Sequence, residues 1–122
     1  MLFRSHYPFL KSHAQYAIAR EQMNGGGGMV TFEVEGTGED ARRLSEAMRL
    51  FTLAPSLGGV ESLVSIPVLT SHLTVPPEER RRIGITEQMI RLSVGIENAD
   101  DLIADLERAL ASVAAPQQVQ VG

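Results

Sequence analysis

The stretch Met89-Ile-Arg-Leu-Ser-Val-Gly-Ile-Glu97 decides the fold, because it is typical of a β-strand with two different faces. Side chains alternate across a strand, so one set of apolar residues is predicted to face the core: Ile90, Leu92, Val94 and Ile96. The opposite face carries Met89, Arg91, Ser93 and Gly95. A guanidinium held on a rigid strand, in the middle of that second face, suggests a binding role.

The segment before this strand is predicted to hold three helices and three strands. Ser12 and Gln15 form a capping-box pattern, which predicts a helix from there to Asn24 and Gly25, with His13 in its first turn. Four glycines (25–28) are a connector rather than a phosphate loop, because a strand follows them instead of a helix. That strand (29–35) has alternate residues predicted to point inward: Val30, Phe32 and Val34.

A second helix is predicted to begin at Thr37, which forms a capping box with Asp40. Its apolar residues recur at helical spacing: Ala41, Leu44, Met48 and Phe51. Short strands are expected at 50–54 and 60–66, separated by Pro55 and a turn at 56–59. A short helix runs from Pro76 to Gly84. A last helix begins at Asn98, and its predicted apolar face is Ala99, Leu102, Ile103, Leu106, Leu110 and Val113.

This order of elements predicts an α+β fold, with an open, mostly antiparallel sheet of about four strands and helices on one face. The face that carries Arg91 is then left for solvent, a partner or a ligand. We expect residues 1–24 to be part of a linker helix, 25–115 to form one small domain, and 116–122 to be a flexible tail.

The composition excludes several classes of function. A net charge of -4 over 122 residues argues against nucleic-acid and membrane-surface partners. The basic run Arg80-Arg81-Arg82 directly follows two glutamates, so we interpret it as a solvated helix. No cysteine is present, which excludes thiolate chemistry and fits a cytoplasmic protein. The three histidines lack metal-ligand spacing, so we expect no metal site.

The remaining candidate for chemistry is Arg91, with Ser93 on its face and the Pro55–Gly59 turn elsewhere in the chain. A guanidinium fork matches a carboxylate with two parallel hydrogen bonds, and a glycine-containing turn can add backbone N–H donors. The alternative is an exposed strand arginine whose stem shields the sheet.

Several motifs resemble the Cys/Met-metabolism enzymes that use pyridoxal phosphate, in particular the cystathionine γ-synthase and γ-lyase group. They are "HYPFLKSHAQYAIAREQMNGGGGMVTFEVEG" (6–36), "SLGGVESL" (56–63), "SH" (71–72), "PPEERRRIGI" (76–85) and "IRLSVGIENADDLIADLERAL" (90–110). The resemblance implies the C-terminal small domain of a type I, aspartate aminotransferase-like enzyme. By matched position, Arg91 receives the substrate's α-carboxylate and Ser56 helps to hold it.

The sequence departs from the family pattern in two places. The family's cofactor lysine lies in a large domain with a Ser-x-Thr-Lys stretch, whereas the only lysine here is Lys11 in unmatched surroundings. We therefore expect no catalytic or cofactor-binding residue in this chain, and no activity from it alone. Pro55 stands where the family usually has a glutamate that tunes substrate choice, so Pro55 is a specificity position.

The resemblance implies a parent enzyme that carries out γ-elimination or γ-replacement on sulfur amino acids or homoserine esters, and that assembles as a homotetramer. "MLFRS" (1–5) does not match the family, so we expect the chain to be a truncated piece of a longer enzyme. Two alternatives stay open. One is a stand-alone amino-acid-binding regulatory module of split βαβ type, and the other is a fragment without activity.

Overall fold

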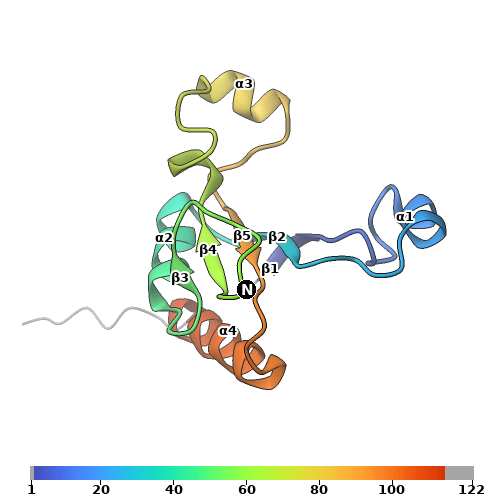
Figure 1. The fold of residues 1–122 in the computed structure, drawn as a ribbon. Coiled ribbons are helices and arrows are strands. Elements are labelled where there is room, and N and C mark those ends of the chain that lie inside the picture. Colours follow the sequence, from blue (N-terminus) through green and yellow to red (C-terminus); the bar gives the residue numbers. More distant parts are fainter. Residues whose placement is uncertain (1, 115–122) are drawn as a thin grey trace, which may run out of the picture.

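The computed structural model describes residues 2–114, which form one open sheet and four α-helices (Figure 1). In chain order the elements are β1 (Leu2–His6), α1 (Tyr16–Gln22), β2 (Met29–Val34), α2 (Gly38–Ala47), β3 (Thr52–Leu53), β4 (Leu63–Ser65), the 3-10 turn η1 (Pro67–Leu69), α3 (Pro77–Arg82), β5 (Met89–Ser93) and α4 (Ala99–Ala114). The sheet order is β1-β2-β5-β4-β3. Only β3 and β4 pair in parallel, so the predicted fold class is confirmed.

Helices α2 and α4 cover one face of the sheet, and the core lies between them and the strands. The buried core residues are Phe32, Val34, Ala41, Leu44, Met48, Phe51, Val64, Ile90, Leu92, Leu102 and Ala109. Helices α1 and α3 lie away from the sheet, α1 to its right and α3 above it in Figure 1. The prediction of helices on one face therefore holds for the two helices that enclose the core.

The segment from β2 into α2 forms as the sequence predicts. Phe32 and Val34 are buried, and the Thr37 hydroxyl accepts a hydrogen bond from the Asp40 N–H at 3.3 Å. The Asp40 carboxylate accepts in return from the Thr37 N–H at 2.8 Å, which completes the capping box. Two otherwise unpaired amides at the helix start are satisfied in this way.

The predicted start of the first helix is wrong. The chain makes successive turns in which Leu10, His13 and Tyr16 donate their N–H groups to the carbonyls three residues earlier. Helix α1 begins only at Tyr16, and its N-cap residue makes no side-chain cap. His13 lies in these turns, where its Nδ1 accepts from the Gln15 N–H at 3.0 Å.

Strand β1 was not predicted, and it raises the expected four strands to five. It pairs antiparallel with β2, with His6 opposite Thr31 and Ser5 opposite Phe32. A five-residue strand without a regular alternation of apolar and polar residues gives little pattern to read, and its partner lies more than twenty residues downstream. The predicted domain boundary at residues 24–25 stays a prediction, and the predicted tail at 116–122 lies outside the described residues.

The prediction that alternate side chains of residues 89–97 face the core is only partly correct. Ile90 and Leu92 are buried as expected, but so are Met89 and Ser93, because β5 is a central strand with neighbours on both edges. After Ser93 the chain leaves the sheet, and Ile96 is 81% exposed instead of facing the core. Strand β4 is likewise shorter than the predicted 60–66.

Helix α4 presents a narrower apolar face than predicted. Leu102 is buried, and Leu106, Leu110 and Val113 pack against the core, but Ile103 is 54% exposed. Asn98 caps the helix as predicted, since its Oδ1 accepts from the Asp101 N–H at 3.1 Å. The apolar contact that was expected from Ile103 is absent because the residue lies at the margin of the stripe.

One buried carboxylate fastens α4 to the end of α2. Asp105 accepts hydrogen bonds from the N–H groups of Arg49 (2.8 Å), Leu50 (2.8 Å) and Phe51 (3.4 Å), and from the Arg108 guanidinium (2.8 Å). Burial raises the pKa of Asp105, but these donors together hold it below its ordinary value. The chain between α2 and β3 is therefore tied to α4 by a charged acceptor.

Candidate functional site

Arg91 lies in the middle of β5, on the sheet face opposite α2 and α4. Its cross-strand neighbours on that face are Thr31 on β2 and Ser65 on β4. Because β5 is hydrogen-bonded on both edges, the position of the Arg91 backbone is fixed by two ladders. The Ser65 hydroxyl is buried and has no hydrogen-bond partner among the described residues.

The structure brings the predicted site residues together at residues 55–62, which we call the 55–62 loop. Arg91 Nη2 donates to the carbonyl oxygen of Pro55 at 3.1 Å and to that of Ser56 at 3.5 Å. Within the described part of the chain, the Nε and Nη1 donors of Arg91 have no partner. The guanidinium is thus oriented by the loop and keeps donors for a ligand.

Ser93, which was predicted to share the face of Arg91, also contacts this loop. Its hydroxyl oxygen accepts a hydrogen bond from the Gly58 N–H at 2.8 Å. We had expected glycine amides of the turn to be free for a carboxylate, and for Gly58 this is wrong. That amide instead attaches the loop to β5, while the side chain of Ser56 stays exposed.

Two residues that the sequence analysis missed hold the other end of the loop. The Glu97 carboxylate accepts from the Ser62 N–H at 3.0 Å and from the Ser62 hydroxyl at 2.8 Å, and these two bonds hold the pKa of Glu97 below its ordinary value. The Ser62 hydroxyl also accepts from the Gly95 N–H at 2.9 Å. A serine within an apolar stretch was the available signal, since a buried hydroxyl needs a partner.

Gly95 allows a close approach between the loop and the chain that follows β5. A Cβ atom at this position would lie 2.2 Å from the Val60 carbonyl oxygen and 2.6 Å from a Glu97 carboxylate oxygen. The Ile96 N–H donates to the same Val60 carbonyl at 2.9 Å. The missing side chain of Gly95 therefore lets two backbone segments meet.

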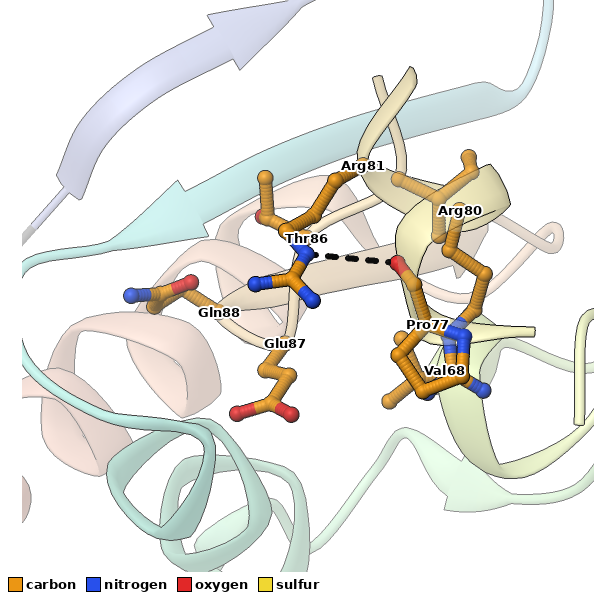
Figure 2. A pocket seen from close by; sticks show the side chains of 8 residues that line it. Val68, Pro77, Arg80, Arg81, Thr86, Glu87 and Gln88 are labelled. Carbon is orange, nitrogen blue, oxygen red and sulfur yellow. Dashed lines mark hydrogen bonds between the residues drawn. The ribbon is translucent and has the colours of Figure 1, made fainter. Parts of the chain in front are cut away.

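A separate pocket of about 270 Å³ lies at the other end of β5 (Figure 2). Its lining residues are Val68, Pro77, Arg80, Arg81, Ile85, Thr86, Glu87 and Gln88. Arg81 Nε donates to the Pro77 carbonyl at 3.3 Å, as Figure 2 shows. Arg82 pairs with Glu79 on the exposed side of α3, which confirms the solvated helix. None of the predicted site residues lines this pocket.

The remaining polar side chains serve local contacts. His6 Nε2 lies 3.1 Å from a Glu33 carboxylate oxygen, and the Thr86 hydroxyl donates to the other oxygen at 2.9 Å. Within residues 2–114, no group of three histidine or acidic side chains could hold a metal ion. In the same range, no helix is long and apolar enough to cross a membrane.

The fold and the site together define an α+β domain that presents an arginine fork beside a glycine-containing loop. A family model for the Cys/Met metabolism PLP-dependent enzymes matches residues 2–111. The chain therefore belongs to the Cys/Met metabolism family of pyridoxal-phosphate-dependent enzymes. The match begins within "MLFRS", so the expectation that this segment departs from the family is wrong.

Individual relatives carry out different reactions, as their names state. Over 104 residues the chain is 52% identical to a cystathionine γ-lyase of Dictyostelium discoideum, covering 85% of this chain and 27% of that one. It is 49% identical over 107 residues to a cystathionine β-lyase of Coxiella burnetii, covering 88% of this chain and 28% of the lyase. The chain also aligns with the structure of cystathionine γ-synthase from Xanthomonas oryzae pv. oryzae in complex with cystathionine, with a TM-score of 0.88 and 41% identity. The alignment covers 93% of this chain and 29% of the synthase.

The chain thus spans somewhat more than a quarter of the length of the relatives it matches, with 27% and 28% for the two lyases. Its likeness to them is that of a C-terminal portion, as the matched motifs indicated. Activity, substrate and assembly belong to the whole enzymes and are considered as proposals below.

Proposed function

We propose that this chain is the C-terminal, substrate-closing domain of a pyridoxal-phosphate-dependent enzyme that performs γ-elimination or γ-replacement on sulfur amino acids or homoserine esters. Arg91 and Ser56 bind the α-carboxylate of the amino acid. The observation that carries the proposal is the 3.1 Å contact between Arg91 Nη2 and the Pro55 carbonyl, which joins residues 36 positions apart in the sequence.

The geometry supports carboxylate binding through the donors that remain. Nε and Nη1 of Arg91 have no partner among the described residues, and Ser56, whose backbone carbonyl accepts from Nη2 at 3.5 Å, is exposed. A carboxylate that takes two charge-assisted hydrogen bonds has its orientation fixed as well as its position. Fixing the α-carboxylate also fixes the direction of the neighbouring Cα–H bond, which reactions at that carbon require.

The residues present do not fit the cofactor itself. Pyridoxal phosphate needs a lysine, and the only lysine of the chain, Lys11, is exposed in the turns before α1. We therefore derive no step through the cofactor and propose that the chain alone is inactive. The part of the family that is not in this chain supplies the lysine, and the parent assembles as a homotetramer.

Pro55 is proposed as a specificity position because it lies beside the arginine. Its carbonyl accepts from Arg91, while its ring replaces the glutamate that is usual at this place in the family. A ring without charge or donor cannot bind a polar distal group of a substrate. The relatives are named as a γ-lyase, a β-lyase and a γ-synthase, and we propose that the residue at this position contributes to such differences in reaction.

The test joins this chain to the cofactor-binding part of a relative. The chain replaces the matched segment of the Dictyostelium discoideum enzyme, and cystathionine cleavage is measured. We expect activity in the fused enzyme and none in the chain alone. Arg91→Ala should raise KM by about 100-fold with the cofactor absorbance unchanged, since a lost charged hydrogen-bond pair costs about 3 kcal/mol.

Arg91→Lys keeps the charge but loses the planar fork, so KM should rise about tenfold. The matched control is Arg49→Ala, since the Arg49 side chain is exposed and its backbone N–H, not its guanidinium, donates to Asp105. A normal KM in Arg91→Ala would contradict the carboxylate role. Binding of a free amino acid by the chain alone, seen by calorimetry, would favour the regulatory-module alternative.

A further inference from the structure

The carboxylate site needs a loop that stays in place, yet this loop has little support of its own. Residues 56–61 are all exposed, and none of them belongs to a helix or a strand. Gly58 has a backbone φ of +78°, which glycine adopts freely, so its conformation does not resist motion. The loop therefore depends on bonds to other segments.

Apart from the Ser62 carbonyl, which accepts from the Thr52 N–H of β3 at 3.0 Å, those bonds lead to β5 and the four residues that follow it. Ser93 accepts from Gly58, and Ile96 donates to Val60. Glu97 takes both donors of Ser62, its N–H and its hydroxyl. The end of the loop is thus attached to the same short segment that carries Arg91.

The contact between Glu97 and Ser62 needs a carboxylate, not merely a polar side chain. Oε2 accepts from the backbone N–H of Ser62 at 3.0 Å, while Oε1 accepts from its hydroxyl at 2.8 Å. With its proton committed to Glu97, the hydroxyl oxygen is free to accept from the Gly95 N–H at 2.9 Å. A glutamine would offer one acceptor and would turn an NH₂ group toward a donor.

We propose that Glu97 is a positioning residue that fixes the 55–62 loop against the end of β5, so that Ser56 and Arg91 face the same substrate carboxylate. This inference rests on the function proposed above. Glu97 does not touch the carboxylate; it acts through Ser62 and the loop. Its loss should affect the order of the loop and the affinity for substrate more than the core of the domain.

The first test uses the 122-residue chain and measures amide hydrogen exchange by NMR in the wild type and in Glu97→Gln. We expect exchange at Gly58, Ser62 and Ile96 to rise at least about tenfold, while exchange at the core residue Ile90 changes little. Glu61→Gln is the matched control, since this neighbouring carboxylate is exposed and has no partner among the described residues. An equal rise at all four amides would show general destabilisation and overturn the proposal.

Ser62→Ala provides a second route to the same answer if Glu97→Gln folds poorly. It removes the hydroxyl that links Glu97 to Gly95 and should raise loop exchange similarly. The effect of the double variant should be clearly smaller than the sum of the two single effects, because both changes remove the bond between the Ser62 hydroxyl and Glu97. Full additivity of the two effects would overturn the proposed coupling.

The second test is kinetic and uses the fused enzyme described above. Glu97→Gln should raise KM about five- to tenfold with kcat within about twofold, the pattern of lost substrate binding. If Arg91→Ala raises KM but Glu97→Gln does not, the positioning role fails while the proposed function stands. If Arg91→Ala itself leaves KM unchanged, the proposed function fails, and the inference fails with it.

Discussion

Replacing Asp105 with asparagine should weaken the fold strongly and in a way that depends on pH. The carboxylate accepts from three consecutive backbone N–H groups, Arg49–Phe51, and from Arg108. Hydrogen bonds to a charged group contribute about 1.5–3 kcal/mol each in net terms, and asparagine keeps one acceptor oxygen without the charge. We therefore expect the free energy of unfolding to fall by about 2–3 kcal/mol.

The size of this loss makes it easy to measure by thermal unfolding. For a domain of this length, each kcal/mol corresponds to about 3–4 °C, so Asp105→Asn should lower Tm by about 6–12 °C. Asp100→Asn is the matched control, since that carboxylate is exposed in the first turn of the same helix. Its helix-dipole contribution is only about 0.3–1 kcal/mol.

The pH dependence follows from the direction of the pKa shift. The pKa of Asp105 is lower in the folded protein than in the unfolded chain, because the amide and guanidinium donors outweigh the effect of burial. Its stabilising contribution is therefore complete above about pH 4, the ordinary aspartate value, and is lost as pH falls through the folded pKa. The Tm difference between wild type and Asp105→Asn should be constant from about pH 5 to 8 and shrink below about pH 4.

Circular dichroism melts of both proteins from about pH 3 to 8 would provide the measurement. A Tm within experimental error of the wild type at neutral pH would refute the reasoning. A difference that stays constant down to the lowest pH would also refute it, since the donors would then not be stabilising a charge.

Two further predictions concern hydroxyl groups. Ser65→Ala should leave the free energy of unfolding unchanged or raise it by up to about 1 kcal/mol, because the buried Ser65 hydroxyl has no partner among the described residues. The measurement is urea unfolding, and a loss above about 1 kcal/mol would reveal a partner. Thr37→Ala should cost about 1 kcal/mol by removing the acceptor of the capping box, whereas Thr37→Ser should cost little; equal losses in urea unfolding would show that the hydroxyl is not the cause.

Much of the fold was visible in the sequence because its signals are local. The strand around Phe32 and the capping box at Thr37 depend on residues within one element, and both are as predicted. The exposure of Ile96 could not be predicted, because the chain leaves the sheet to meet Val60, more than thirty residues earlier. Strand β1 was missed for a similar reason, since its pattern becomes meaningful only beside β2.

In the candidate site, too, features with a local sequence signal were predicted and features that depend on distant segments were missed. Arg91 stood out because a charge in the middle of an apolar strand is unusual, and its proximity to Pro55 and Ser56 was implied by the family motifs. Glu97 and Ser62 did not stand out, because neither residue type is rare and their contact appears only after two distant segments meet.

The central place of β5 in the sheet has a consequence for how such a site can diversify. Arg91, which we propose binds the substrate carboxylate, lies on a strand paired on both edges, whereas position 55 belongs to an exposed bend. Under the proposed function, substitutions at 55–57 would change selectivity without moving Arg91, which makes those three positions a compact target for combinatorial libraries.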